Sequence, residues 1–125
     1  MSTVTRRFAF WAPAIAWASG IFFVSSVPGS DLPGGIPPGL GHFGAYFVLG
    51  ALLYLALRID LPARQALVIA VALASAYGVT DEFHQRFVAM RTPDVYDWAV
   101  DTLGALAGAG VALATSRRLA VRRSG

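Results

Sequence analysis

The chain of 125 residues contains no cysteine and no lysine, and it has few charged residues of any kind. Without cysteine, disulfide bonds and thiolate metal sites are excluded. Charged residues make up 14% of the chain and hydrophobic residues 56%, whereas a soluble domain carries about 25% charged residues. This scarcity of charge argues against a soluble domain and favours an integral membrane protein.

What the chain does contain is four apolar blocks, at about residues 8–27, 42–58, 64–85 and 96–117. A hydrocarbon core about 30 Å thick takes roughly 20 helical residues, and the four blocks meet or approach that length. The connections between them are short enough to join antiparallel neighbours. We therefore predict an all-α fold, a polytopic membrane protein in which residues 1–125 form a single domain of four transmembrane helices with up-down-up-down topology.

The basic residues are distributed unequally between the two predicted sides of the membrane. All ten are arginines, and eight of them share one side: Arg6, Arg7, Arg58, Arg64, Arg117, Arg118, Arg122 and Arg123. Only Arg86 and Arg91 lie on the other side. The positive-inside bias predicts that both termini are cytoplasmic. The arginine-rich tail is typical of an orientation signal attracted to anionic lipid headgroups, and we expect no nucleic-acid partner.

Polar residues recur at helical spacing near the predicted outer ends of three helices, where each set forms a stripe on one face. The stripes are His42 and Tyr46 with Gly50, then Tyr77, Asp81 and Gln85 with Glu82 on the adjoining ridge, and then Asp97 and Asp101 with Gly104 and Gly108. The spacing Gly-x-x-x-Gly allows another helix backbone to approach closely, so we assign Gly104 and Gly108 to helix packing. Ionisable residues inside a membrane are costly and usually functional.

Four carboxylates near one membrane surface cannot all be charged and unpaired at low dielectric. They are Asp81, Glu82, Asp97 and Asp101, and the available cations are Arg86 and Arg91. In a structural interpretation, Arg91 pairs with one of these acids and ties the outer loop to the helix ends. Because buried ion pairs often stabilise no better than apolar packing, a functional interpretation stays open beside it.

Two chemical roles for this cluster are open. In the first it binds a ligand without reaction; in the second, His42 or Glu82 is the general base of an intramembrane enzyme acting on a lipid-linked substrate, with paired carboxylates as acid or metal ligands. Asp97-x-x-x-Asp101 places two carboxylates on one helical face, a spacing that suits a hard cation such as Mg²⁺. The motif is short and common, so we expect no bound metal and no cofactor.

The polar residues also match a known pattern. It consists of Asp81-Glu82-x-x-Gln85-x-Phe87-x-x-x-Arg91, then Asp97 and Gly104-Ala105-x-x-Gly108, with His42-Phe43-x-x-Tyr46 upstream and Ser26-x-Pro28 after the first apolar block. In order and spacing these residues resemble the VanZ-like family of bacterial membrane proteins, and the resemblance covers nearly the whole chain. It implies a multi-pass protein of the bacterial plasma membrane with a role in the cell envelope.

The family's namesake is linked to resistance against the glycopeptide teicoplanin, so the resemblance implies that this chain modulates teicoplanin susceptibility. The expected ligand of the outer cluster is a lipid headgroup or a cell-wall precursor, with Arg91 as the anion contact and Glu82, Gln85 and Asp97 as hydrogen-bonding partners. The chain departs from the family pattern at two places. Pro38 and Gly39 stand where an Asp-Lys pair is common, and Asp101 stands where Asn is common. The first departure removes the lysine cation from the outer site, and the second adds a potential anion at Asp101.

Overall fold

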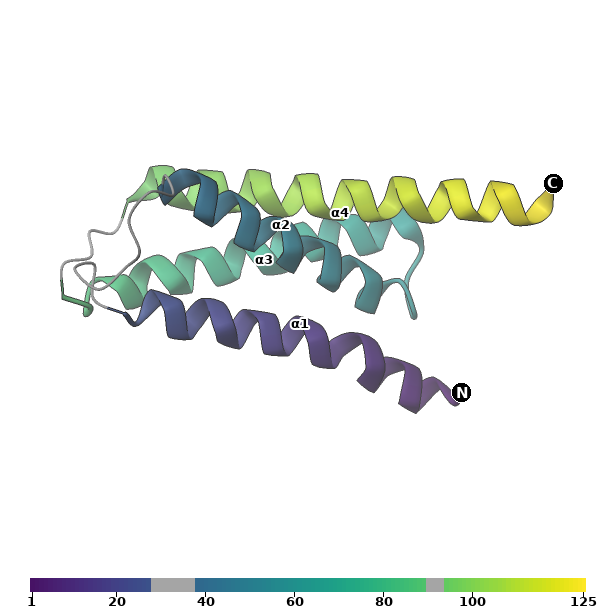
Figure 1. Cartoon of the computed structure of the whole chain (residues 1–125), viewed down its shortest axis with the longest axis horizontal. Coiled ribbons are helices and arrows are strands. Elements are labelled where there is room, and N and C mark those ends of the chain that lie inside the picture. Colours follow the sequence, from purple (N-terminus) through teal and green to yellow (C-terminus); the bar gives the residue numbers. More distant parts are fainter. Residues whose placement is uncertain (28–37, 90–93) are drawn as a thin grey trace.

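The protein folds into four long helices in a computed structural model that describes residues 1–27, 38–89 and 94–125. They are α1 (Thr3–Ser25), α2 (Pro38–Leu57), α3 (Ala63–Gln85) and α4 (Val95–Ser124). Each is long and apolar enough to cross a membrane, and the described residues contain no strand. The predicted all-α membrane fold is confirmed. Successive helices alternate in direction (Figure 1), consistent with an up-down-up-down topology.

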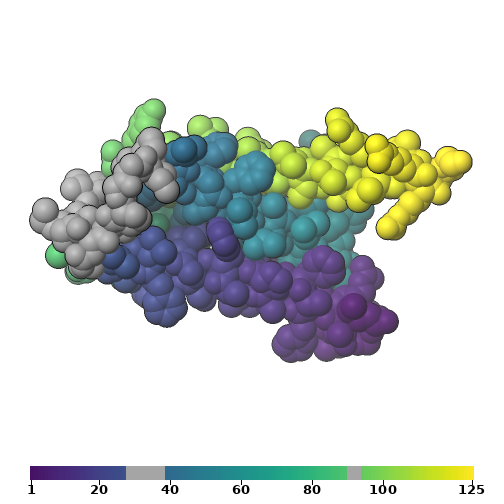
Figure 2. Space-filling view, in the orientation of Figure 1, coloured from purple at the N-terminus to yellow at the C-terminus, as the bar shows by residue number. Residues whose placement is uncertain are grey.

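All four helices are longer than the apolar blocks that predict them, and α1 and α4 each extend further toward a chain terminus. The first begins at Thr3 rather than near residue 8, because the Ser2 hydroxyl caps it by accepting a hydrogen bond from the Thr5 N–H at 3.1 Å. The last continues to Ser124 rather than ending near residue 117, because no glycine or proline interrupts residues 111–124. Arginines in its last turn also suit the negative end of the helix dipole. Figure 2 shows this end of α4 extending beyond the other helices.

Glycines let α2 and α4 pack with their backbones in contact. A Cβ added at Gly108 would collide with the carbonyl oxygen of Phe47, and one at Gly104 would lie 2.5 Å from that of Phe43. From the other side, a Cβ at Gly50 would collide with the backbone of Ala105. Small residues at such a crossing allow the close approach on which helix association in membranes depends. This contact fixes the register of α2 against α4.

The buried face of α3 changes from small to polar along its length. Ala66, Ala70, Ala74 and Gly78 follow one another at intervals of four residues and are buried. On the next turns the same face carries Asp81 and Gln85, which are also buried. Ser75 on this helix accepts a hydrogen bond at its carbonyl oxygen from the Trp98 indole N–H at 3.1 Å. The polar face of α3 therefore meets α4.

Helix α1 packs against the outside of this three-helix group and exposes most of its residues. The Trp17 indole N–H donates to the Ala45 carbonyl of α2 at 2.8 Å, and Ser26 Oγ lies 2.8 Å from Nε2 of His84 on α3. At the opposite end, Arg7 forms an exposed ion pair with Asp60 at 2.8 Å. In Figure 1 both chain termini lie at that second end, while α1 and α3 end and α2 and α4 begin at the first.

Candidate functional site

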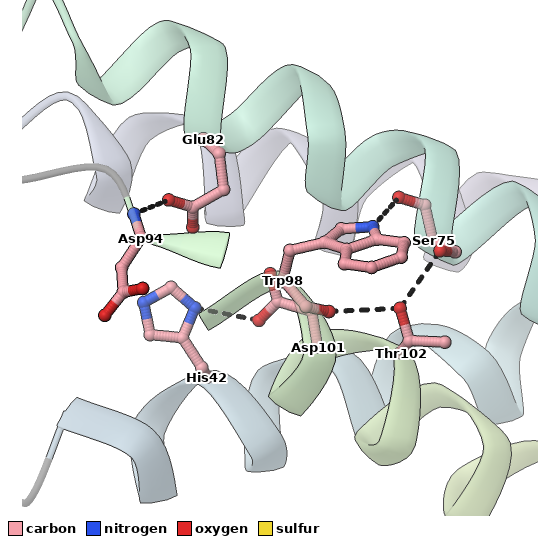
Figure 3. A network of polar contacts seen from close by, with 7 residues as sticks. All are labelled: His42, Ser75, Glu82, Asp94, Trp98, Asp101 and Thr102. Atoms are coloured by element: carbon pink, nitrogen blue, oxygen red, sulfur yellow. Dashed lines mark hydrogen bonds and ion pairs between the residues drawn. The ribbon is translucent and has the colours of Figure 1, made fainter. Parts of the chain in front are cut away.

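A histidine and an aspartate from neighbouring helices form the first part of the site. Because Gly104 of α4 rests on the backbone of Phe43, the preceding turn of α4 brings Asp101 beside His42 of α2. Nδ1 of His42 lies 2.8 Å from Oδ1 of Asp101 (Figure 3). The Asp101 side chain is 0% exposed and that of His42 is 16% exposed. The pair is therefore open to the surroundings only through the imidazole.

Two carboxylates of α3 complete the group. One potential ligand atom each from His42, Asp81, Glu82 and Asp101 lies within 4.8 Å of every other. We call these four residues the acid–histidine cluster. It combines three helices and lies about 4.5 to 9 Å inside the nearest helix ends, at 1.5 Å of rise per residue. This depth is within the first turns of the membrane-spanning segments, at the end that carries the α1–α2 and α3–α4 connections.

Several oxygen atoms of this region have no hydrogen-bond partner. Among the described residues these atoms are Oδ1 of Asp81, Oε1 of Glu82, Oδ2 of Asp101 and the hydroxyl of Tyr46, and all are buried. The second oxygen of Glu82 accepts a hydrogen bond from the Asp94 backbone N–H at 2.8 Å. Buried polar atoms normally find a partner, since leaving one unsatisfied is costly. Four such oxygens therefore gather at this end of the described bundle.

The space for Asp101 depends on a glycine and a tryptophan. A Cβ added at Gly78 would lie 3.2 Å from Cδ1 of Trp98 and 3.3 Å from Oδ2 of Asp101. Trp98 is held by its indole hydrogen bond to α3, and the Ser75 and Thr102 hydroxyls lie 3.0 Å apart below it. These contacts join α3 to α4 beside the cluster.

A groove of about 390 Å³ opens between α3 and α4 beside the cluster. Its lining is mostly apolar, with a polar part at one end: Val79, Glu82, Phe83, Arg86, Asp94, Val95 and Trp98. Glu82 belongs to both the groove and the acid–histidine cluster. Arg86 is exposed, and its guanidinium carbon lies 5.8 Å from the centre of the Phe83 ring. The groove therefore offers apolar side chains and charged ones side by side.

The structure brings some of the predicted site residues together and leaves others apart. His42, Asp81, Glu82 and Asp101 come together in the cluster. Tyr46 is 1% exposed and Gln85 is 3% exposed, and both face the bundle interior without belonging to the cluster. Asp97 is partly buried on α4 and is not among the four residues that converge. Arg91, the predicted anion contact, lies outside the described residues.

The groove contains residues that the sequence does not single out. Arg86 is recognisable in the sequence as a cation, but only the structure places it beside Glu82 and Phe83 in the groove. Trp98 precedes Asp101 by three residues, which puts both on neighbouring parts of one helical face. That spacing is the only sequence signal that could have linked the tryptophan to the site.

The comparisons with known proteins agree with the fold. A family model described as VanZ/LLP1 matches residues 8–116. This range includes the cluster, the groove and most of all four helices. No curated protein and no solved structure matches the chain.

Proposed function

Since the chain belongs to the VanZ/LLP1 family, we propose that it is a cell-envelope protein that binds a phosphate-bearing lipid in the groove between α3 and α4. The bound molecule is either a phospholipid or a lipid-linked cell-wall precursor, which share a hydrocarbon chain and a phosphate group. The arginine distribution supports an orientation with the groove on the outer side and both termini in the cytoplasm of a bacterial cell.

The observation that carries this proposal is the composition of the groove. Val79, Phe83 and Val95 give it an apolar wall at the membrane surface, and Arg86 supplies a cation at the same opening. Arginine presents planar N–H groups that match phosphate oxygens. Hydrocarbon chain and phosphate of one lipid therefore find separate partners within a single groove. Arg86 is thus an anion contact beside Arg91, for which the sequence predicts the same role.

The cluster behind the groove gives the headgroup a second point of contact. Glu82 turns one oxygen to the Asp94 N–H and leaves the other without a partner among the described residues. That free oxygen suits a hydroxyl or ammonium group attached to the phosphate. Selectivity among lipids then depends on Glu82, whereas affinity for the shared phosphate depends on Arg86.

Native mass spectrometry of the purified chain, released from nanodiscs, tests this proposal. One set of nanodiscs contains phosphatidylglycerol and phosphatidylethanolamine, and a second set also contains a polyprenyl diphosphate. Binding of one lipid per chain is expected, with retained lipid reduced about tenfold in Arg86→Ala. Arg64→Ala is the matched control, because Arg64 is exposed at the opposite end of the bundle. Equal retention in both variants would show that the groove is not the lipid site.

We also propose that an effect on teicoplanin susceptibility depends on this same site. Expression of the wild-type chain in a susceptible bacterial host is expected to lower the amount of surface-bound teicoplanin and to raise the inhibitory concentration. Glu82→Gln, which keeps the shape of the side chain but removes its charge, is expected to abolish both effects at matched membrane levels. If the variant protected as well as the wild type, the effect on teicoplanin would not depend on this site.

An enzymatic function is supported by a different observation, the contact between His42 and Asp101. A carboxylate on one imidazole nitrogen orients the ring and leaves the other nitrogen able to take a proton. In this alternative His42 is the general base for attack on a lipid-linked substrate. Comparing the lipids of cells that express wild-type protein or His42→Gln would test it, since turnover requires a product that depends on His42. Identical lipid profiles would exclude this reaction for the lipids measured.

A further inference from the structure

We propose that the acid–histidine cluster holds one divalent cation, with His42, Asp81, Glu82 and Asp101 as its ligands. The site goes beyond lipid binding, and its existence does not depend on which lipid the groove accepts. It also departs from the sequence analysis, which expects no bound metal and gives Asp97 with Asp101 as the spacing that suits a hard cation. In the folded chain Asp101 meets three residues from other helices instead.

The spacing of the four side chains suits a single ion. Their potential ligand atoms all lie within 4.8 Å of one another. Ligands at about 2.0 to 2.3 Å from an ion can be no more than about 4.6 Å apart. Small side-chain rotations are therefore enough to close all four on one cation. The 2.8 Å between Nδ1 of His42 and Oδ1 of Asp101 is close to the separation of about 3 Å expected for neighbouring ligands.

The unpartnered oxygens are an independent reason to place a cation here. The Asp101 side chain is completely buried and its Oδ2 atom has no partner, while Asp81 is 4% exposed with Oδ1 unpartnered. Within residues 1–27, 38–89 and 94–125, His42 is the only basic side chain that forms an ion pair with the cluster. A buried carboxylate without a cation or a donor is strongly disfavoured. A divalent cation would satisfy these oxygens and offset their charge.

The ligand types favour a transition metal over an alkaline-earth ion. The set contains one imidazole and three carboxylates, and the chain has no thiolate to offer. Calcium and magnesium prefer sites made of oxygen alone, whereas an imidazole suits first-row transition metals. We therefore expect Zn²⁺ or Mn²⁺ to bind more tightly than Mg²⁺ or Ca²⁺. In the absence of an ion, the charge of the cluster would have to be removed by protons.

Isothermal titration calorimetry on the full chain in detergent distinguishes a cluster that binds a metal ion from one that is neutralised by protons. After treatment with EDTA and removal of the chelator, titration with ZnCl₂ or MnCl₂ is expected to show one ion per chain. Asp101→Asn is expected to weaken binding about 100-fold, a loss typical of a damaged metal site. Asp97→Asn is the matched control, because it removes the same charge one turn away on the same helix. Its affinity is expected to stay within about threefold of wild type.

A second readout covers the case in which Asp101→Asn fails to fold. The wild type is expected to unfold at a higher temperature with the ion than without it, and His42→Gln is expected to lose the preference for Zn²⁺ over Mg²⁺. Absence of both heat and stabilisation in the wild type would mean that protons neutralise the cluster, and the proposal would be wrong. Equal weakening by Asp97→Asn and Asp101→Asn would overturn it too, as a sign of diffuse surface binding.

An ion in the cluster would occupy the free oxygen of Glu82 in place of a headgroup hydroxyl or ammonium, and would itself give a lipid phosphate a second positive contact besides Arg86; this step rests on the proposed function. Lipid retention measured with and without EDTA separates the two ideas. Ion binding without lipid binding would support the metal site and remove the proposed function. A second outcome is a chain that binds no ion and whose lipid binding requires Arg86 but is unchanged by EDTA. This outcome would exclude the metal site and leave the proposed lipid binding intact.

Discussion

At the scale of single residues, the site is defined by polar atoms that the protein buries without satisfying. The Tyr46 hydroxyl is one of them: its side chain is fully enclosed, and its oxygen has no partner among the described residues. Tyr77 is a neighbour whose ring centre lies 6.4 Å from that of Tyr46 and whose hydroxyl donates to the Ala18 carbonyl. The two tyrosines therefore differ in what their hydroxyl groups contribute to the folded state.

Replacing each tyrosine with phenylalanine measures this difference. Tyr46→Phe removes an unsatisfied hydroxyl, so the ligand-free protein is expected to be as stable as wild type or more stable, by up to about 1 kcal/mol. Tyr77→Phe removes a made hydrogen bond and is expected to destabilise by about 0.5 to 1.5 kcal/mol. Thermal unfolding in detergent, followed by circular dichroism, provides the measurement. A loss of stability in Tyr46→Phe as large as in Tyr77→Phe would reveal a partner for the Tyr46 hydroxyl.

At the scale of helices, the crossing of α2 and α4 is the contact on which the site depends. Gly104 and Gly108 place α4 on the backbone of α2, and that register brings Asp101 to His42. A change that separates the two helices moves the histidine away from the aspartate without altering either residue. The packing of α2 against α4 therefore determines the geometry of the site.

The substitution Gly108→Ala tests that dependence. The added methyl group has no room against the Phe47 carbonyl, so the helices must move apart, at a cost of about 1 to 3 kcal/mol. Gly110→Ala is the control, since a Cβ there meets nothing within 4 Å and alanine is the better helix former. Thermal unfolding is expected to rank Gly110→Ala at or above wild type and Gly108→Ala below it. The reverse order would contradict the observed crossing.

The sequence predicts which face of each helix turns inward but not which residues meet across helices. Spacing of three and four residues identifies Asp81, Gln85 and Asp101 as sharing faces with buried small residues, and the structure buries all three. The same reasoning groups Asp97 with Asp101, because it follows a single helix. The contact between His42 and Asp101 depends on the position of α2 along the axis of α4. Backbone contacts at glycines determine this position, and the residue pattern of a single helix cannot predict it.

At the scale of the whole molecule, the two ends of the bundle have opposite chemistry. The acid–histidine cluster and the groove lie at one end, and eight of the ten arginines lie on the other side of the predicted membrane. Helix α4 is 30 residues long, or about 45 Å, so it exceeds a hydrocarbon core of about 30 Å. We therefore expect its arginine-rich end to extend into the headgroup region on the side of the termini.

Cysteine labelling tests the predicted orientation, and a chain without native cysteine suits the method. Ala89→Cys and Ser124→Cys are exposed positions at opposite ends of the bundle. A membrane-impermeant maleimide applied to intact cells is expected to label Ala89→Cys, whereas Ser124→Cys should react only after the cells are permeabilised. Labelling of Ser124→Cys alone in intact cells would invert the orientation and place the groove on the cytoplasmic side.

The division of the site among α2, α3 and α4 has a consequence for how the protein is made. Helices leave the ribosome in chain order, so the acids of α3 reach the membrane before α4 supplies the Asp94 N–H to Glu82 and Asp101 to His42. Until then the polar face of α3 has few partners and is unfavourable in lipid. We expect α3 and α4 to enter the bilayer as a pair, so that the site is assembled by the last step of biogenesis.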